Sequence, residues 1–239
     1  MPLFSIVTVT FNARQYIENS IKSVVNQNYK DFEYIIIDGC STDGTLDIIN
    51  KYADNISMII SEPDTGIYDA MNKALDRVTG DYILFLGADD FLYGEDTLHD
   101  LSKILDLNKL DLLIGRVKYT SGKVFTSIFN YKTLLNNTVH HQAALYQKDL
   151  FKDFRFDVKF SLIADYELNL RLYLRRRDIR YLFIENFVAL CTDGGLSRKQ
   201  IQIGRHETNL VRRKVLGKVA SILKILFELK FYITTKLSA

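Results

Sequence analysis

Cysteine is scarce in this sequence: the 239 residues include only Cys40 and Cys191. Two cysteines cannot build a disulfide framework, so we expect a reducing compartment and two small buried thiol side chains. No apolar run reaches the roughly 18 residues that a membrane-spanning helix needs. No basic segment precedes the strand-like run at residues 4–11, so we expect no signal peptide. The GxGxxG and Walker A patterns are also missing, which argues against a dinucleotide or P-loop nucleotide site.

The composition is that of an ordinary globular protein, with 47% hydrophobic and 25% charged residues, enough for one sizeable core. The small net charge of +2 conceals an asymmetry. Residues 198–239 hold ten basic and two acidic residues, whereas the remainder holds 21 basic and 27 acidic ones. An acidic body with a basic tail indicates an anionic partner surface. Nucleic acid is not expected as a partner, because the tail is mostly aliphatic and carries no nucleic-acid-binding motif.

The first half of the chain alternates strand-like and helix-like segments. Strand-like runs rich in Val, Ile and aromatic residues occupy 4–11, 32–38, 56–61 and 80–86. Helical spacing of apolar residues separates these runs, as at Ile17, Ile21 and Val24. This rhythm predicts an α/β fold with right-handed crossovers and a mostly parallel sheet.

A polar cluster follows each of the four predicted strands: "TFN", "DGCSTDG", "EPDTG" and "GADD". The carboxyl ends of parallel strands share one edge of a sheet, and ligands bind beyond that edge. Four clusters in phase therefore predict one site along this edge.

The cluster "GADD" ends a buried strand on two adjacent carboxylates, Asp89 and Asp90. Adjacent carboxylates repel each other, and each is costly to desolvate. A divalent cation would relieve both problems, because hard cations prefer carboxylate oxygens. The alternative is that the pair opens a turn or caps a helix that follows near Gly94.

The second half is less regular. Helical patterns favour helices over 96–105 and 165–177, and strands are expected over 110–119, 123–129 and 179–191. The segment 140–151 mixes two histidines with apolar residues, and 192–197 reads as a loop.

Four motifs in order carry a family resemblance: "TVTFN", "IIIDGCSTDGT", "GIYDAMNKAL…GDYILFLGADD" and "HQAALYQKDLF…ADYELNLRL". Over residues 3–200 the chain resembles the family 2 inverting glycosyltransferases of the GT-A fold, especially those of bacterial polysaccharide synthesis. The resemblance implies a Rossmann-like sheet flanked by helices. It implies a nucleotide-sugar-binding half over 1–92, an acceptor-binding half over 93–197 and a basic amphipathic helical tail over 198–239.

The resemblance also implies the chemistry. Asp90 would hold Mn²⁺ or Mg²⁺ on the donor diphosphate, with Asp89 beside it toward the ribose or the metal. The family commonly has Asp-x-Asp, and here Gly87 stands at the first position, which shortens the signature and lowers the number of protein ligands. Asp165 falls on the position of the general base, and Glu167 is the fallback. Only one base is needed in an inverting transfer.

The resemblance further implies contacts to the nucleotide-sugar. Asp38 would accept a hydrogen bond from the base, the backbone of residues 8–11 would hold the nucleoside, and His141 would lie near the acceptor or diphosphate. Asn12 as a helix cap, Tyr68 as a packing residue and structural histidines remain alternatives. The full expected set is Thr8, Thr10, Phe11, Asn12, Asp38, Gly66, Tyr68, Asn72, Asp89 and His141.

His140 and His141 do not predict a zinc site, because neither cysteine has a ligand-like spacing to them.

The tail carries a polar stripe on a broad apolar helix, formed by Lys214, Lys218, Ser221, Lys224 and Glu228. Such a helix fits a membrane interface, its own domain or a second subunit of a homodimer.

We expect a UDP-sugar donor and a glycan or polyprenyl-diphosphate-linked acceptor, as in lipopolysaccharide, O-antigen or capsule synthesis. The expected location is cytoplasmic, peripheral at the inner face of the cell membrane. The alternatives are an inactive sugar-nucleotide-binding module of a membrane-associated assembly and a sugar nucleotidyltransferase.

Overall fold

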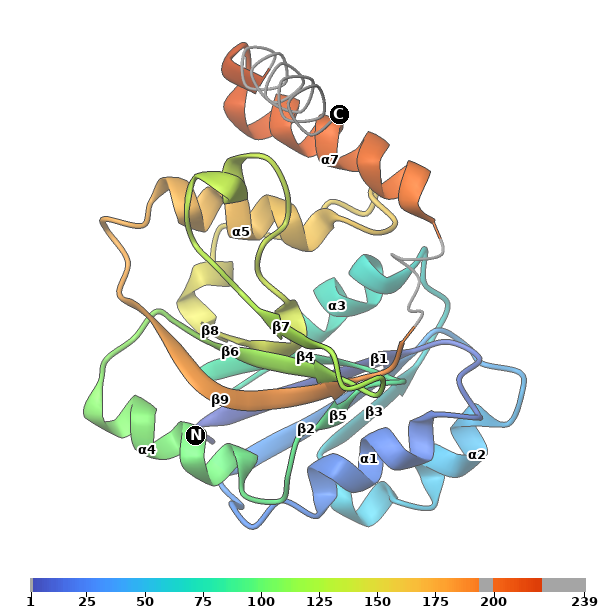
Figure 1. The fold of residues 1–239 in the computed structure, drawn as a ribbon. Coiled ribbons are helices and arrows are strands. Elements are labelled where there is room, and N and C mark those ends of the chain that lie inside the picture. Colours follow the sequence, from blue (N-terminus) through green and yellow to red (C-terminus); the bar gives the residue numbers. More distant parts are fainter. Residues whose placement is uncertain (1, 194–199, 221–239) are drawn as a thin grey trace.

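A computed structural model describes residues 2–193 and 200–220 of the chain. Within these residues one nine-stranded sheet forms the centre, in the order β3-β2-β1-β4-β8-β6-β9-β5, with β7 paired to β6 (Figure 1). The first four strands are parallel: β1 (Phe4–Thr10) lies between β2 (Phe32–Asp38) and β4 (Tyr82–Gly87), and β3 (Met58–Ser61) extends the sheet beyond β2. The predicted α/β fold is confirmed, with its parallel part in the first half of the chain.

The second half of the sheet is mixed. Strand β8 runs antiparallel to both β4 and β6, and β9 runs parallel to β6 and antiparallel to β5. The strand expected over 123–129 is shorter than predicted, because the chain leaves the sheet after Thr126. The strands of this half are β5 (Phe91–Leu92), β6 (Leu112–Tyr119), β7 (Val124–Thr126), β8 (Ala144–Gln147) and β9 (Tyr181–Cys191).

Helices cover both faces of the sheet, which explains the uninterrupted apolar strands (Figure 1). One core lies under α1, α2 and α4, and the other lies under α3 and α5. Successive side chains of β1 alternate between them, with Phe4 and Ile6 in the first core and Val7 and Val9 in the second. The helices are α1 (Ile17–Val25), α2 (Thr45–Asn50), α3 (Ile67–Leu75), α4 (Thr97–Leu107), α5 (Ala164–Leu174) and α7 (Ile201–Leu216). Short 3-10 helices are η1 (Ala53–Asn55), η2 (Tyr131–Leu134), η3 (His141–Ala143) and η4 (Lys148–Phe151).

The two cysteines differ in burial. Cys191 is buried as expected, but Cys40 is exposed, so that prediction is wrong. Cys40 has a φ of 61°, and this left-handed conformation belongs to the turn that carries the chain out of β2.

Helix α7 packs on α5 and is fixed there by a buried carboxylate (Figure 1). Glu207 Oε1 accepts hydrogen bonds from the Ser161 backbone N–H (2.7 Å) and hydroxyl (2.8 Å), and Oε2 accepts from the Leu162 N–H (2.9 Å). These bonds hold α7 to the segment that leads into α5.

Lys214 also faces the body of the protein. Its ammonium group contacts Asp157 (2.7 Å) and Glu167 (2.8 Å), so this member of the predicted lysine stripe binds the chain's own carboxylates. Residues 221–239, with the rest of the stripe beyond Lys218, lie outside the described residues. Within the described part of the chain, no helix is both long and apolar enough to cross a bilayer.

We predict that Glu207→Ala lowers the free energy of unfolding by about 1–2 kcal/mol, because three donors lose a charged acceptor. The corresponding fall in Tm is roughly 2–8 °C, measurable by thermal unfolding. His206→Ala removes an exposed neighbour and is the control. Equal unfolding temperatures for the two variants would show that these bonds do not secure α7.

Candidate active site

The polar clusters that follow the first four strands lie along one edge of the sheet, as predicted. The register of the parallel strands pairs Thr10 with Asp38, Asp38 with Ser61 and Val9 with Gly87. The four strands therefore release their following segments at the same level, and this part of the prediction is confirmed.

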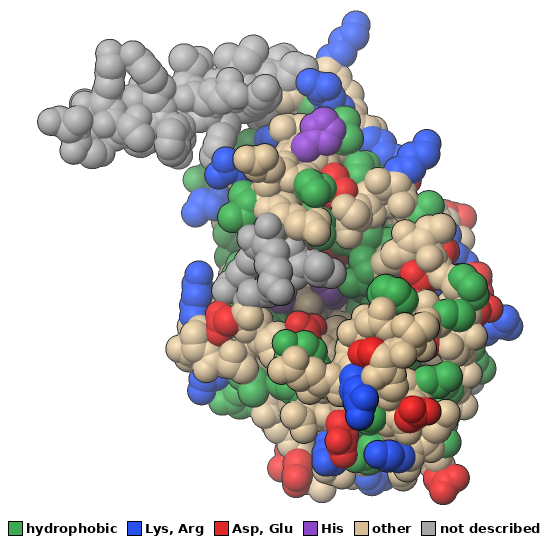
Figure 2. All heavy atoms as spheres, turned by 90° about the vertical axis from the view of Figure 1, so that its right-hand side faces the viewer, with side chains coloured by type: hydrophobic (Ala, Val, Ile, Leu, Met, Phe, Trp, Pro, Cys, Tyr) green, Lys and Arg blue, Asp and Glu red, His purple; other side chains and the backbone are tan. Residues whose placement is uncertain are grey.

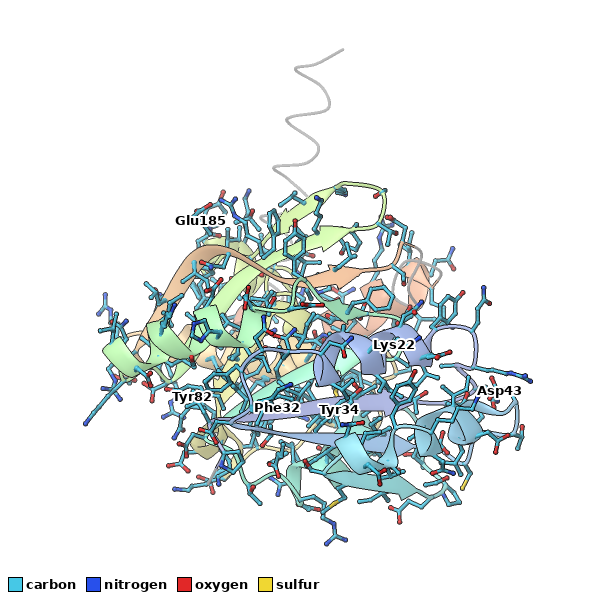
Figure 3. The ribbon with its side chains drawn as sticks, turned by 90° about the horizontal axis from the view of Figure 1, so that it is seen from below. Lys22, Phe32, Tyr34, Asp43, Tyr82 and Glu185 are labelled. Atoms are coloured by element: carbon cyan, nitrogen blue, oxygen red, sulfur yellow. The ribbon has the colours of Figure 1, made fainter. Side chains whose placement is uncertain are left out.

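A view of the molecule from below shows the same strand direction. In Figure 3, Phe32 and Tyr82, which begin β2 and β4, lie at one end of the sheet, and Asp43, in the turn after β2, lies at the other. Figure 2 faces the edge where the parallel strands end, and acidic side chains appear over the middle of that face. Several of the lysines and arginines in this view lie near its outline.

Asp38 is fully buried at the end of β2 and anchors the loop that follows. Its Oδ2 accepts from the Ser41 backbone N–H (3.0 Å) and the Ser61 hydroxyl (2.7 Å), and its Oδ1 accepts from the Ser41 hydroxyl. These donors fix the carboxylate in one orientation. Its predicted bond to a nucleotide base stays a prediction.

Asn12 joins the loops after β1 and β2. Its side-chain oxygen accepts from the Thr42 N–H (2.9 Å), and its own N–H donates to the Ser41 hydroxyl (2.8 Å). Its φ of 48° is a left-handed conformation that asparagine tolerates. The alternative that Asn12 caps the next helix is wrong, because α1 begins only at Ile17, after Tyr16 in the cap position.

The predicted nucleoside-binding segment presents different groups along its length. Thr8 turns its hydroxyl into the core, 3.1 Å from the Tyr34 hydroxyl. Thr10 is buried, and its hydroxyl has no hydrogen-bond partner among the described residues. Phe11 is 63% exposed. At the end of β1, a buried hydroxyl without a partner among the described residues is thus followed by an exposed aromatic ring.

Asp90 is buried behind the end of β4, where its Oδ2 accepts from the Gln142 side-chain amide (2.8 Å). Burial, together with the charge of Asp89, raises the pKa of Asp90. Asp89 accepts a hydrogen bond from the Thr192 hydroxyl (2.8 Å).

Gly87 allows both carboxylates to converge. A Cβ at this position would lie 2.6 Å from Asp90 Oδ2 and 3.1 Å from Asp89 Oδ1, so the two oxygens occupy the space of the absent side chain. The shortened "GADD" signature thus brings its two remaining carboxylates together.

The donor atoms gathered here fit a divalent cation. Asp89 and Asp90 supply carboxylate oxygens, and Gln142 Oε1 is buried without a hydrogen-bond partner among the described residues. Oxygen donors are those that Mg²⁺ and Mn²⁺ prefer. No group of three or more His, Cys, Asp or Glu within the described ranges could hold a metal alone, so diphosphate and water would have to complete the shell.

Asp165 lies in the first turn of α5, buried, with three donors around its carboxylate. Tyr68 donates to Oδ1 (3.0 Å), Asn137 donates to Oδ2 (2.7 Å), and His141 Nδ1 lies 3.1 Å from Oδ2. Burial alone would raise the pKa of Asp165, but the hydrogen bonds from His141, Tyr68 and Asn137 outweigh it and hold that pKa below its usual value.

Two neighbouring residues of η3 connect these carboxylates. His141 contacts Asp165, and Gln142 contacts Asp90. One short turn therefore brings a carboxylate from β4 and another from α5 into one site.

Three residues predicted at the donor site have structural roles of their own, and their predicted contacts to the donor stay predictions. Tyr68 was expected to line the donor pocket, but it is buried and donates to Asp165, and burial raises its pKa so that it stays protonated. Both arms of the Asn72 amide bond to the Phe156 backbone (2.8 and 2.9 Å), so this side chain holds a loop. Gly66 has a φ of 131° with open space at its Cβ position, so backbone conformation explains the glycine.

Glu167, the fallback base, serves the packing of helices. Its carboxylate is bound by Arg171 (2.7 Å) and by Lys214 (2.8 Å), whereas Asp165 faces the cluster of His141 and Asn137. The geometry therefore favours Asp165 as the base.

Sequence reasoning missed Gln142 and Asn137. Gln142 had a usable signal, because it directly follows His141 in "HQA". Asn137 had none, since it stands in the irregular segment after β7.

A family model described as glycosyl transferase family 2 matches residues 5–180. The chain belongs to this family. One relative is a PGL/p-HBAD biosynthesis glycosyltransferase of Mycobacterium bovis (strain BCG / Pasteur 1173P2). It is 34% identical to this chain, and the match covers 72% of this chain and 70% of that protein. The poly(ribitol-phosphate) beta-N-acetylglucosaminyltransferase TarS of Staphylococcus aureus (strain MW2) is 28% identical, over 76% of this chain and 34% of the relative.

Solved glycosyltransferase structures share the fold. S. aureus TarS 1-349 in complex with UDP-GlcNAc superposes with a TM-score of 0.71 at 20% identity, covering 90% of this chain and 72% of that one. The mannosyltransferase PcManGT from Pyrobaculum calidifontis, in complex with GDP-Man and Mn²⁺, gives 0.60 at 19% identity, covering 90% and 62%. The GT-A fold is thereby confirmed, and membership in the family decides against a sugar nucleotidyltransferase.

We predict that Asp90→Asn raises the unfolding temperature in EDTA near neutral pH. The folded-state pKa of Asp90 lies above its unfolded value, so the ionised carboxylate destabilises the fold at pH values above that folded pKa. The gain should shrink as the pH falls through the folded pKa of Asp90, because the wild-type carboxyl then becomes neutral too.

Thermal unfolding across a pH series measures this effect. Asp149→Asn is the control, because the pKa of that exposed carboxyl is lowered by its hydrogen bond to Lys152. A lower unfolding temperature for Asp90→Asn near neutral pH would contradict the prediction.

Proposed function

We propose that this glycosyltransferase moves a sugar, with inversion, from a UDP-sugar to a hydroxyl of a glycan or polyprenyl-diphosphate-linked acceptor. The observation that carries the proposal is the joint placement of Asp90 and Asp165 by the neighbouring residues Gln142 and His141. Residues 1–92 would bind the donor, and residues 93–197 would bind the acceptor.

The donor would lie along the edge where β1, β2 and β4 end. Phe11 would cover the base, Thr10 and Asp38 would contact the nucleoside, and the diphosphate would reach the carboxylates after β4. UDP is the favoured nucleotide because a structure with the same fold, TarS, binds UDP and UDP-GlcNAc.

A divalent cation, Mn²⁺ or Mg²⁺, would neutralise the charge that develops on the leaving diphosphate. Asp90 and Asp89 would hold it, with Gln142 Oε1 as a further oxygen donor. Asp90 accepts a hydrogen bond from the Gln142 amide and lies beside the negative charge of Asp89, which suits a group that receives a cation.

Asp165 would act as the general base. Its Oδ1 accepts one hydrogen bond, from Tyr68, and a carboxylate oxygen has room for a second. The acceptor hydroxyl would donate there, and its proton would pass to Asp165 as the oxygen forms a bond to the anomeric carbon and the bond to the diphosphate breaks. Tyr68, Asn137 and His141 keep the carboxylate ionised and oriented.

The names of two relatives support the proposed acceptor class. One is named for a transfer to poly(ribitol-phosphate), and another for PGL/p-HBAD biosynthesis. We infer that this chain serves surface polysaccharide synthesis, such as that of lipopolysaccharide, O-antigen or capsule, at the inner face of the cell membrane.

We predict that substitutions of Asp165 and Asp90 cause different defects. The assay measures UDP release from UDP-GlcNAc, UDP-glucose and UDP-galactose in the presence of Mn²⁺ and acceptor. Asp165→Asn should lower kcat by about 10²–10⁴-fold and leave UDP binding intact, because the base acts only in the chemical step. Asp90→Ala should abolish metal-dependent UDP binding as well as turnover.

Asp149→Asn, at an exposed site, is the matched control. Full activity of Asp165→Asn would overturn the assignment of the base, and UDP binding by Asp90→Ala that still depends on Mn²⁺ would overturn that of the metal ligand.

A further inference from the structure

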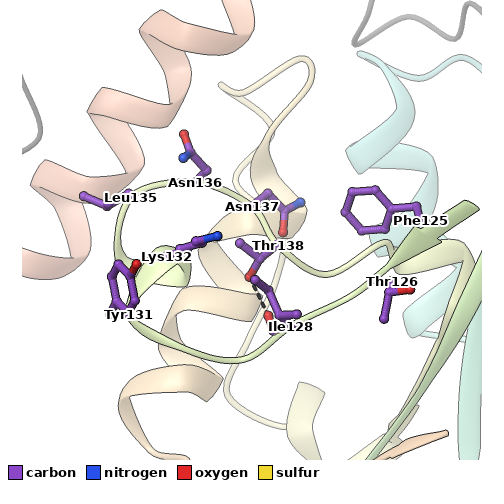
Figure 4. A pocket seen from close by; sticks show the side chains of 9 residues that line it. All are labelled: Phe125, Thr126, Ile128, Tyr131, Lys132, Leu135, Asn136, Asn137 and Thr138. Carbon is purple, nitrogen blue, oxygen red and sulfur yellow. Dashed lines mark hydrogen bonds between the residues drawn. The ribbon is translucent and has the colours of Figure 1, made fainter. Parts of the chain in front are cut away.

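A cavity of about 410 Å³ lies beside the active site, enclosed by the segment that leaves β7 and returns toward η3 (Figure 4). Its volume is in the range of small-molecule sites. The proposed donor site uses none of its lining residues.

The cavity wall is built from internal hydrogen bonds. The Thr138 hydroxyl donates to the Ile128 carbonyl (2.6 Å), and the Ile128 N–H donates to the Thr138 carbonyl (3.0 Å). The Asn130 side chain accepts from the Lys132 N–H (2.9 Å), which starts η2. The segment thus forms a closed ring, so the cavity is pre-formed.

The lining combines an apolar wall with one cation. Phe125, Ile128 and Tyr131 supply apolar and aromatic surface, and Tyr131 is 56% exposed. Figure 4 shows the Lys132 side chain pointing across the ring toward Asn137 and Thr138. Within residues 2–193 and 200–220, no carboxylate pairs with the Lys132 ammonium group.

Asn137 connects this cavity to the chemistry. It lines the cavity, and its side-chain amide donates to Asp165 Oδ2 (2.7 Å) while its oxygen accepts from Asn169 (3.1 Å). Asp90 is linked to Asp165 through the neighbouring residues Gln142 and His141, whereas the cavity is linked to Asp165 through Asn137. The nucleotide-sugar and a ligand in the cavity would therefore approach Asp165 past different residues.

We propose that this cavity binds the acceptor and selects one that carries a phosphate ester; the assignment rests on the proposed function. The phosphate pairs with the Lys132 ammonium group, and the sugar lies within the cavity. Phosphate is favoured because lysine is a common phosphate ligand and binds it as a point charge.

Two probes test the proposal: octyl β-N-acetylglucosaminide, and N-acetylglucosamine joined to an octyl chain through a phosphodiester. Calorimetric titration of the full chain measures their Kd without any turnover. We expect the phosphodiester probe to bind about tenfold more tightly than the neutral one, since a charge-assisted hydrogen bond is gained. Lys132→Ala should remove this preference, and Lys132→Arg should retain most of it.

Lys123→Ala removes a lysine outside the cavity lining and is the matched control. Equal Kd values for the two probes with wild type, or a preference that survives Lys132→Ala, would overturn the proposal. UDP release is followed separately: phosphodiester binding that depends on Lys132 without any UDP release would refute the proposed transfer reaction while leaving the cavity assignment in place.

Discussion

The site depends on one tight turn, η3. Its backbone is closed by the hydrogen bond from the Ala143 N–H to the His140 carbonyl (3.0 Å), so His141 and Gln142 leave it in fixed and different directions. One reaches the carboxylate of α5 and the other reaches that of β4. Because β8 follows at once and is paired to β4 and β6, the sheet itself sets the position of the turn. A shift of this turn would move both carboxylates relative to each other.

The two carboxylates have opposite environments although both are buried. Asp165 receives three donors, which outweigh its desolvation and lower its pKa. Asp90 receives an amide from Gln142 but also faces Asp89, and its pKa is raised. A buried carboxylate with a raised pKa gains from a cation, and one stabilised by several hydrogen-bond donors can stay ionised beside an acceptor hydroxyl. The environment thus gives the two carboxylates the different properties that their proposed roles need.

The two halves of the sheet make different contributions. The parallel half delivers four loops to one edge, and the mixed half delivers η3 and the segment around the cavity to the same region. Helix α7 secures the approach to α5 through Glu207, which accepts hydrogen bonds from the backbone just before Asp165. Parts distant in the sequence therefore hold Asp165 in place.

The sequence by itself determined the α/β rhythm, the common edge after the first four strands and the adjacent carboxylates, because each follows from local patterns of apolar and polar residues. It could not determine which polar groups meet. Tyr68 donates to a carboxylate 97 positions away, and Glu167, two residues after Asp165, is bound to α7. The side-chain partner of a buried group is chosen by packing between distant elements, and only the tertiary structure decided that Asp165 faces the site while Glu167 faces a lysine.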